Sequence, residues 1–256
     1  MMTVPARKLM DICKSLPAAA ELTASQDGAR VQIDSGRFIS HLTTLPPVEF
    51  PRVETSVTKV SVSLASAQLH KLLQRTSFAM AQQDVRYFFN GILFEFIDGR
   101  VRLVATNGLR LATSYIDMEQ ETGNHQFIVP RKAVSEVLRL LSGIAEESTI
   151  FLEFTANHLK LKVQGITLVT KLIDATYPDY SRVIPDRGHK IILAEKQVLK
   201  DALSRTAILS NELNRNVRLI MMPGKLEMHA NNPQQEEAEE SLAVSYEGEV
   251  LEIGFN

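Results

Sequence analysis

The sequence predicts an α+β protein with antiparallel sheets, built from copies of one kind of domain. Three observations lead to this prediction: a strand-rich stretch with two tight turns, four amphipathic helical segments, and similar segments that recur 125 to 132 positions apart. A repeat of this length indicates duplication of a whole domain, because the units of solenoid proteins are much shorter.

The strand-rich stretch runs from Gln82 to Leu111. Tyr87 to Phe96 is aromatic and aliphatic, which is typical of a strand. Asp98-Gly99 is a strong hairpin-turn signal, and the residues after it alternate between apolar and polar as in a half-buried return strand. A second turn at Asn107-Gly108 leads into a third strand. The stretch therefore predicts an antiparallel meander.

Four other segments carry apolar residues at helical spacing. The predicted helices cover residues 5–16, 65–80, 130–142 and 194–209. Cys13 is expected on the inward stripe of the first helix and Val198 on that of the last. Short strands are expected between the helices, so that each unit reads as helix, strands, helix, strands.

The repeat divides the chain into three parts. Val4-Pro5, at the head of the first helix, recurs as Val129-Pro130 at the head of the third. In this phase, residues 1–57 match the second half of a unit, 58–187 are one complete unit, and 188–256 match the first half of another. The chain is therefore expected to begin and end within a domain.

Composition excludes several classes of protein. The 256 residues carry a net charge of −2 and a single cysteine, which rules out an internal disulfide and favours a cytoplasmic protein. No apolar run approaches the roughly 20 residues of a membrane span. The six histidines lack metal-ligand spacing, and no motif for a nucleotide, a zinc protease or a nucleophilic serine occurs. We therefore expect no catalytic residue, no metal and no cofactor.

Charge is distributed unevenly along the chain. The four predicted helices hold eleven basic and four acidic residues, a net charge of +7, which leaves −9 for the remainder. Basic helices on an acidic body suit a surface that faces phosphate groups. Amphipathic helices carry charge on their exposed faces in any case, so the pattern alone leaves both interpretations open.

The exact amino-acid sequences of several segments identify a family more specifically than these patterns do. Residues 83–95 read Gln-Asp-Val-Arg-Tyr-Phe-Phe-Asn-Gly-Ile-Leu-Phe-Glu, and residues 105–112 read Ala-Thr-Asn-Gly-Leu-Arg-Leu-Ala. Together with segments beginning at Thr3, Phe127, Tyr177 and Ala230, they closely resemble the bacterial DNA polymerase III beta sliding clamp family, in the family's order and over essentially the whole chain.

The resemblance implies a fold and a function. It implies the DNA-clamp fold, with duplicated domains that each pack two helices on curved antiparallel sheets. The family has three such domains, so the chain looks like a fragment that lacks the start of the first and the end of the third. A head-to-tail homodimer would form a ring around duplex DNA. The ring would tether the replicative polymerase, and the chain would be a non-catalytic subunit of the polymerase holoenzyme.

Three sets of site residues follow from the resemblance. Sequence-independent contacts with double-stranded DNA are expected at Arg7, Lys71, Arg75, Gln83, Arg86, Tyr87, Lys132, Arg139 and Lys200. A pocket for short linear motifs of the polymerase, the clamp loader and repair proteins is expected at Phe89, Thr106, Gly108, Arg110, Leu111, Pro178, Arg182 and Val183. A subunit interface is expected at Lys8, Ile12, Leu42, Ile208, Leu209, Glu236, Glu237, Glu239 and Glu240.

Some positions leave alternatives open. Arg86 could contact DNA or could pair locally with Asp84. Asn107 and Leu109 depart from the Thr-Asp-Gly-His-Arg-Leu wording that is usual in the family, and Ser40 stands where an aromatic residue is common. A second hypothesis for the whole chain is a metal-dependent phosphoesterase acting on nucleic acid, with Asp84 and His70 in its centre.

Overall fold

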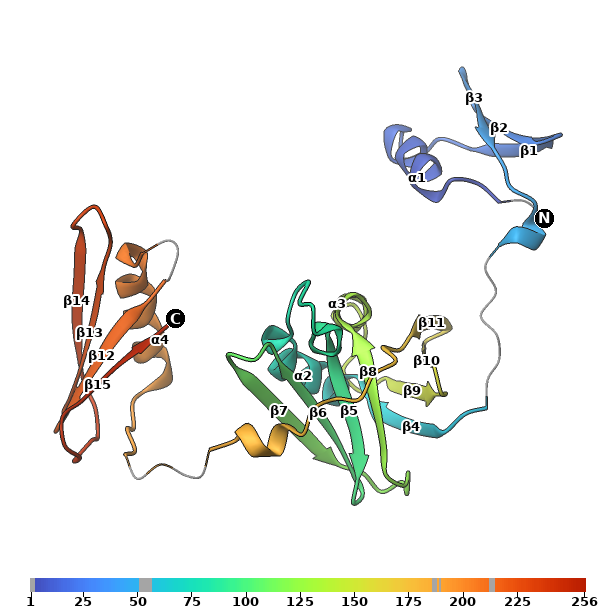
Figure 1. The fold of residues 1–256 in the computed structure, drawn as a ribbon. Helices are drawn as coiled ribbons and strands as arrows, with labels where there is room; N and C mark the ends of the chain where they lie inside the picture. The colour runs from blue at the N-terminus through green and yellow to red at the C-terminus, as the bar shows by residue number, and fades with distance from the viewer. Residues whose placement is uncertain (1–2, 51–56, 186–187, 189, 212–214) are drawn as a thin grey trace. The chain divides into compact units, whose positions relative to one another are not determined.

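The computed structural model describes residues 3–50, 57–185, 188, 190–211 and 215–256. The chain divides into two compact units, Met1–Tyr177 and Pro178–Asn256. The first unit contains a small N-terminal part and a larger middle part, joined through residues outside the described ranges (Figure 1). The predicted domain end at residue 187 also lies outside the described residues.

The N-terminal part is one helix and one three-stranded sheet. Helix α1 (Ala6–Ser15) follows Pro5, whose fixed φ suits the first turn. The sheet has the order β1-β2-β3, with bounds Thr23–Asp27, Arg30–Ser35 and Phe38–Thr43, and a 3₁₀ turn η1 (Pro47–Glu49) follows. Its core consists of Val31, Ile33 and Leu42, with Val4, Leu9 and Ile12 packed against them. The inward prediction for Cys13 is wrong, because its side chain is exposed.

The predicted meander forms one sheet of the middle part. Its order is β7-β6-β5-β8, with bounds Leu111–Asp117, Arg100–Thr106, Gly91–Ile97 and His125–Pro130. Asp98 and Gly99 form the predicted two-residue turn, with φ of +50° and +68°, as a tight hairpin between right-twisted strands requires. The strand prediction fails for Tyr87–Asn90, which is a 3₁₀ helix, η3.

A second four-stranded sheet completes the strands of the middle part. Its order is β11-β10-β9-β4, with bounds Ile166–Lys171, His158–Val163, Thr149–Phe154 and Val60–Ala65. All neighbouring strands in it are antiparallel. Strands β4 and β9 pair although they are far apart in the sequence, so α2, the first sheet and α3 lie between them along the chain.

Helices α2 (Ser66–Thr76) and α3 (Arg131–Leu141) pack against each other and against these sheets. Their buried residues are Leu69, Leu72 and Leu73 in α2, and Val134, Val137 and Leu141 in α3. A short 3₁₀ helix η2 (Ser77–Ala79) extends α2. Both sheets contribute aromatic rings to the same core, where the Phe94 and Phe154 centroids are 5.5 Å apart.

The described residues of the C-terminal unit form one α-helix and one four-stranded sheet. The unit contains η4 (Tyr180–Val183), α4 (Lys196–Thr206), η5 (Ala207–Leu209) and a sheet of order β14-β13-β12-β15. The bounds of these strands are Glu237–Ala243, Lys225–Asn231, Val217–Met222 and Leu251–Phe255. Ala202 of α4 packs on Leu226 and Met228 of β13. The prediction that Val198 faces inward is wrong, because its side chain is 49% exposed. Among the described residues, no helix is both long and apolar enough to span a membrane.

Candidate functional site

The basic side chains of α2 and α3 point away from the core. Lys71 and Arg75 lie on α2, and Lys132 and Arg139 on α3, and all four are exposed. Their placement follows from helical periodicity, because the opposite faces of both helices are buried. Since α2 and α3 pack against each other, the four cations belong to one layer of the middle part. Arg139 is partly neutralised by Glu136, whose carboxylate lies 2.5 Å from its guanidinium.

The two other predicted basic contacts lie in separate parts of the chain. Arg7 is exposed on α1, and Lys200 is exposed on α4. Each again occupies the polar face of its helix. All six predicted helical contacts are therefore accessible, and their role in binding DNA remains a prediction.

The loop before β5 contains Arg86, which pairs with Asp84 and is still half exposed, so its contact with DNA stays a prediction. The guanidinium of Arg86 holds both carboxylate oxygens of Asp84, through Nε–Oδ1 at 3.0 Å and Nη2–Oδ2 at 2.8 Å. This pairing lowers the pKa of Asp84 to about 2. The side chain of Asn90 fixes the same loop by donating to the carbonyl of Asp84 at 2.8 Å. Arg86 is thus a local partner of Asp84, while Gln83 and Tyr87 beside it are exposed.

The turn between β6 and β7 is held by side chains at its start. The amide oxygen of Asn107 accepts from the backbone N–H groups of Leu109 at 3.0 Å and Arg110 at 3.1 Å. The Thr106 hydroxyl donates to the carbonyl of Arg110 at 2.7 Å. Asparagine has the acceptor that this turn needs, so the departure at Asn107 leaves the turn intact. Leu109 is almost fully exposed.

Arg86 ties this turn to the loop before β5. Its Nη2 lies 3.5 Å from the carbonyl oxygen of Asn107, and its guanidinium stacks 4.8 Å from the centre of the Phe89 ring. A side chain at Gly108, where φ is +87°, would meet that guanidinium at 3.2 Å. Phe89 in turn meets Tyr177 edge to face, with ring centres 6.0 Å apart. The structure therefore brings Phe89, Thr106 and Gly108 together.

Two further residues, Phe78 and Arg131, belong to this region, and sequence reasoning did not assign them. Arg110 donates to the carbonyl of Phe78 at 2.6 Å and lies over the Phe78 ring at 5.5 Å. Arg131 donates to the carbonyl of Met80 at 3.2 Å. A cavity of about 470 Å³ opens here between Phe78, Gln83 and Arg131. Another, of about 480 Å³, lies on the sheet of the C-terminal unit. No sequence pattern marked Phe78 or Arg131, because their contacts with this region are made only in the folded chain.

The rest of the predicted pocket is distributed over both units. Leu111 is half-buried at the start of β7. Pro178, Arg182 and Val183 belong to the second unit, where Arg182 pairs with Asp179 at 2.8 Å and Val183 is exposed. Burial raises the pKa of Tyr177, the last residue of the first unit, to about 12.

The predicted interface residues have different environments. The exposed residues are Lys8, Ile208, Glu236, Glu237 and Glu239. Leu42 is only 7% exposed in the N-terminal core, so little of its side chain is left for a partner. Ile12 packs on the same core, and Leu209 is half-buried. Glu240 already pairs with Arg205 of α4, which lowers its pKa.

The comparison with known proteins decides between the two hypotheses. Models of the DNA polymerase III beta subunit match residues 1–54 as its N-terminal domain, 63–179 as its central domain and 181–256 as its C-terminal domain. The chain is 46% identical to the beta sliding clamp of Pseudomonas putida over 99% of its length and 69% of that protein. It is 43% identical to that of Escherichia coli K12 over the same shares.

Solved structures agree with this assignment. A crystal structure of the DNA polymerase sliding clamp from Pseudomonas aeruginosa superposes with a TM-score of 0.91 at 45% identity, covering 100% of this chain and 69% of that one. Another clamp from that organism is bound to griselimycin. The phosphoesterase hypothesis has no support, since Asp84 is held by Arg86 and the matching proteins are clamps. The chain therefore belongs to the DNA polymerase III beta subunit family, the beta sliding clamps, and is a non-catalytic processivity factor.

Proposed function

We propose that the basic faces of α2 and α3 are the surface on which this clamp meets duplex DNA. The observation that carries the proposal is the outward placement of Lys71, Arg75, Lys132 and Arg139 on two helices that pack together. Lysine and arginine contacts to phosphates neutralise charge without reading bases. Weak contacts of this kind allow sliding, while enclosure by a ring keeps the protein on its substrate.

The ring requires a second copy of the chain. We assign the acidic residues Glu236, Glu237 and Glu239 to a head-to-tail interface with the N-terminal part of a partner, where Lys8 is exposed on the basic helix α1. Glu240 contributes less, because Arg205 already neutralises it. A tethered polymerase then rebinds at high effective concentration, so that processivity needs no catalytic group in the clamp. This role in replication places the protein in the cytoplasm.

The surface around Phe89 and Gly108 is proposed to receive short linear motifs of the polymerase and its other partners. The exposed apolar side chain of Leu109, next to Arg110 in the turn, supports this role, and Val183 of the second unit is exposed as well. Peptide pockets combine apolar lining with a few placed polar groups. Leu109 should shift the preference of the pocket toward apolar side chains.

Charge reversal tests the DNA-binding face. Replacing Lys71, Arg75, Lys132 and Arg139 together by Glu should weaken binding to any duplex alike. It should also reduce the slope of log affinity against log salt by about 3.6, since each of the four lost phosphate contacts contributes about 0.9. Fluorescence anisotropy with two unrelated duplexes at several salt concentrations measures both effects.

A control variant changes the same charge elsewhere on the middle part. Lys59, Arg100, Lys160 and Lys171 lie outside the helices, and their replacement by Glu should leave the salt slope nearly unchanged. Equal losses in both variants would show a general charge effect. An unchanged slope in the helix variant would contradict the proposed face.

A further inference from the structure

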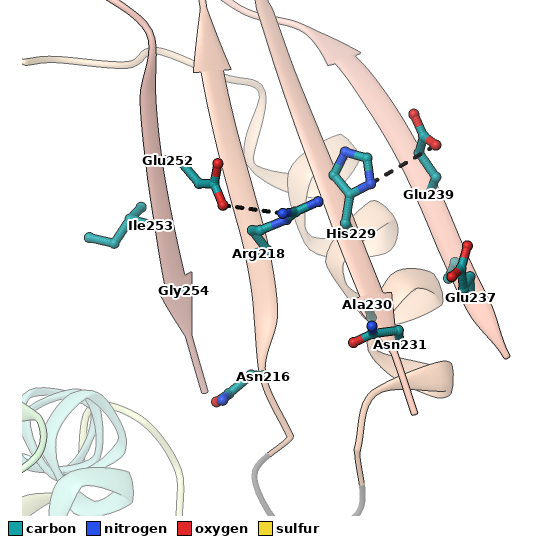
Figure 2. A pocket seen from close by; sticks show the side chains of 11 residues that line it. Asn216, Arg218, His229, Ala230, Asn231, Glu237, Glu239, Glu252, Ile253 and Gly254 are labelled. Carbon is teal, nitrogen blue, oxygen red and sulfur yellow. Dashed lines mark hydrogen bonds and ion pairs between the residues drawn. The ribbon is translucent and has the colours of Figure 1, made fainter. Parts of the chain in front are cut away.

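The sheet of the C-terminal unit has a polar face opposite α4. On β13, Leu226, Met228 and Ala230 pack into the core, so the alternate residues Glu227 and His229 lie on the other face. Glu239 of the neighbouring strand β14 is the register partner of His229. Figure 2 shows His229 and Glu239 side by side on this face, with the helix behind the sheet.

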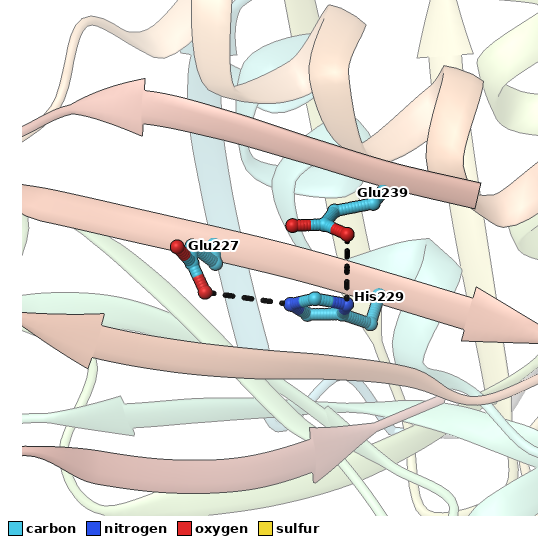
Figure 3. A group of neighbouring side chains, drawn as sticks. All are labelled: Glu227, His229 and Glu239. Atoms are coloured by element: carbon cyan, nitrogen blue, oxygen red, sulfur yellow. Dashed lines mark ion pairs between the residues drawn. The ribbon is translucent and has the colours of Figure 1, made fainter.

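The imidazole of His229 is not satisfied by hydrogen bonds. Its Nε2 atom is buried and has no hydrogen-bond partner. The nearest carboxylate oxygen, Oε2 of Glu227, lies 3.5 Å away (Figure 3). That distance is long for a hydrogen bond. A buried polar atom whose only neighbour is this loose ion pair is uncommon, and a water molecule or a bound ion would satisfy it.

The same distance suits two ligands of one metal ion. With zinc–nitrogen and zinc–oxygen bonds of about 2.0–2.1 Å, two ligands of a tetrahedral ion lie about 3.4 Å apart. Nε2 of His229 and Oε2 of Glu227 already have this spacing. The other oxygen of Glu227 accepts from Lys225 Nζ at 2.6 Å, and such an outer contact fixes the orientation of a ligating carboxylate.

Glu239 supplies a third oxygen donor. Ligand atoms of Glu227, His229 and Glu239 all lie within 4.8 Å of one another. The carboxylate of Glu239 is closest to the other ring nitrogen, Nδ1, at 3.9 Å, so its side chain must rotate to reach an ion held at Nε2. Its side chain is 67% exposed, so rotation meets little resistance.

The surroundings leave space for further ligands. An open cavity of about 480 Å³ adjoins the cluster and is lined by His229, Glu239, Arg218 and Asn231, among others. Water can therefore complete the coordination sphere. One imidazole and two carboxylates with an open position match the ligand preference of zinc. We propose that Glu227, His229 and Glu239 form a divalent-metal site, matched best by Zn²⁺, that links β13 to the edge strand β14.

Zinc titration of the full chain tests the site. Competition against a chromophoric chelator at pH 7.5 should show one zinc ion bound per wild-type chain. His229→Ala should lower the affinity at least 10-fold, as expected when a first ligand is lost, and Glu239→Gln should also lower it. Glu239 is exposed on an edge strand, so its replacement preserves the fold even if a change at His229 were to disturb it.

A second histidine provides the matched control. His41 is exposed on β3 and belongs to no cluster of metal-ligating side chains among the described residues. His41→Ala should bind zinc like the wild type. In nitrogen-15 NMR spectra, zinc should shift the imidazole resonances of one histidine. Those resonances should be missing from the spectrum of His229→Ala. No zinc uptake by the wild type, full affinity in His229→Ala, or equal loss in His41→Ala would each overturn the proposal.

Discussion

Tyr177 combines an aromatic contact with a buried hydroxyl at the end of the first unit. Its side chain is 6% exposed and meets Phe89 edge to face. Burial disfavours the charged phenolate and raises the pKa of Tyr177 from 10 to about 12, an effect that the backbone of Thr106 opposes only weakly. Ionisation of the Tyr177 phenol at high pH should therefore weaken the packing of Tyr177 against Phe89.

This ionisation gives a pH-dependent prediction. The neutral phenol stabilises the folded state below pH 10, and that contribution is lost as the pH rises from 10 towards 12, because the unfolded chain then loses its proton more easily. The wild type should lose about 1–3 kcal/mol relative to Tyr177→Phe over this range. Urea denaturation of both proteins at pH 9 and 11.5 measures the difference.

Tyr115→Phe serves as the control, because Tyr115 is exposed on β7. Groups that titrate in every variant cancel when each is compared with the wild type. An unchanged difference between wild type and Tyr177→Phe across the two pH values would show that the Tyr177 hydroxyl is solvated.

Single residues show where sequence reasoning reached its limit. Asp84 and Arg86 are two positions apart, so a local pair was foreseeable, but its bidentate geometry depends on the backbone of the loop before β5. The role of Phe78 as a partner of Arg110 could not be foreseen, since the two lie 32 positions apart and meet only through the fold. Spacing reveals neighbours along one element, and contacts between elements need the tertiary structure.

At the scale of elements, periodicity predicted the four helices and the hairpin at Asp98-Gly99. The 3₁₀ helix at Tyr87–Asn90 was mistaken for a strand because aromatic residues favour strands, whereas here they cover the end of the core. Val198 has the spacing of an inward residue, yet α4 buries only Ala202 and Thr206 fully. A helix with a narrow buried face cannot be recognised from its apolar pattern alone.

The buried face of α2 allows a direct test. Leu72 is 1% exposed in the core of the middle part, and Leu72→Ala removes atoms whose space the close-packed neighbours cannot refill. The change should lower the free energy of unfolding by about 2–5 kcal/mol. Gln74→Ala, on the exposed face of the same helix, should stay within about 0.5 kcal/mol. Urea denaturation followed by far-UV circular dichroism compares them, and equal effects would contradict the assigned face.

For the whole molecule, the three parts differ in how much core each one has. The middle part buries residues from two sheets and two helices in one cluster. The C-terminal cluster is smaller, and the N-terminal cluster has only Val31, Ile33 and Leu42 as fully buried members among the described residues. No residue of α1 is buried. Because small cores leave little surplus over conformational entropy, the parts should differ in stability.

Hydrogen exchange should resolve this difference along the chain. Backbone amides of α3 open only when the large core does, so they should exchange orders of magnitude more slowly than those of α1, which a small cluster holds. The strands of the C-terminal unit should fall between the two. Mass spectrometry of exchanged peptides measures all three in one sample, and light scattering of that sample establishes whether it is monomeric. Association of chains would protect α1 and β14 by covering their exposed faces and edges. Protection of α1 equal to that of α3 in a strictly monomeric sample would therefore contradict the ranking of the cores.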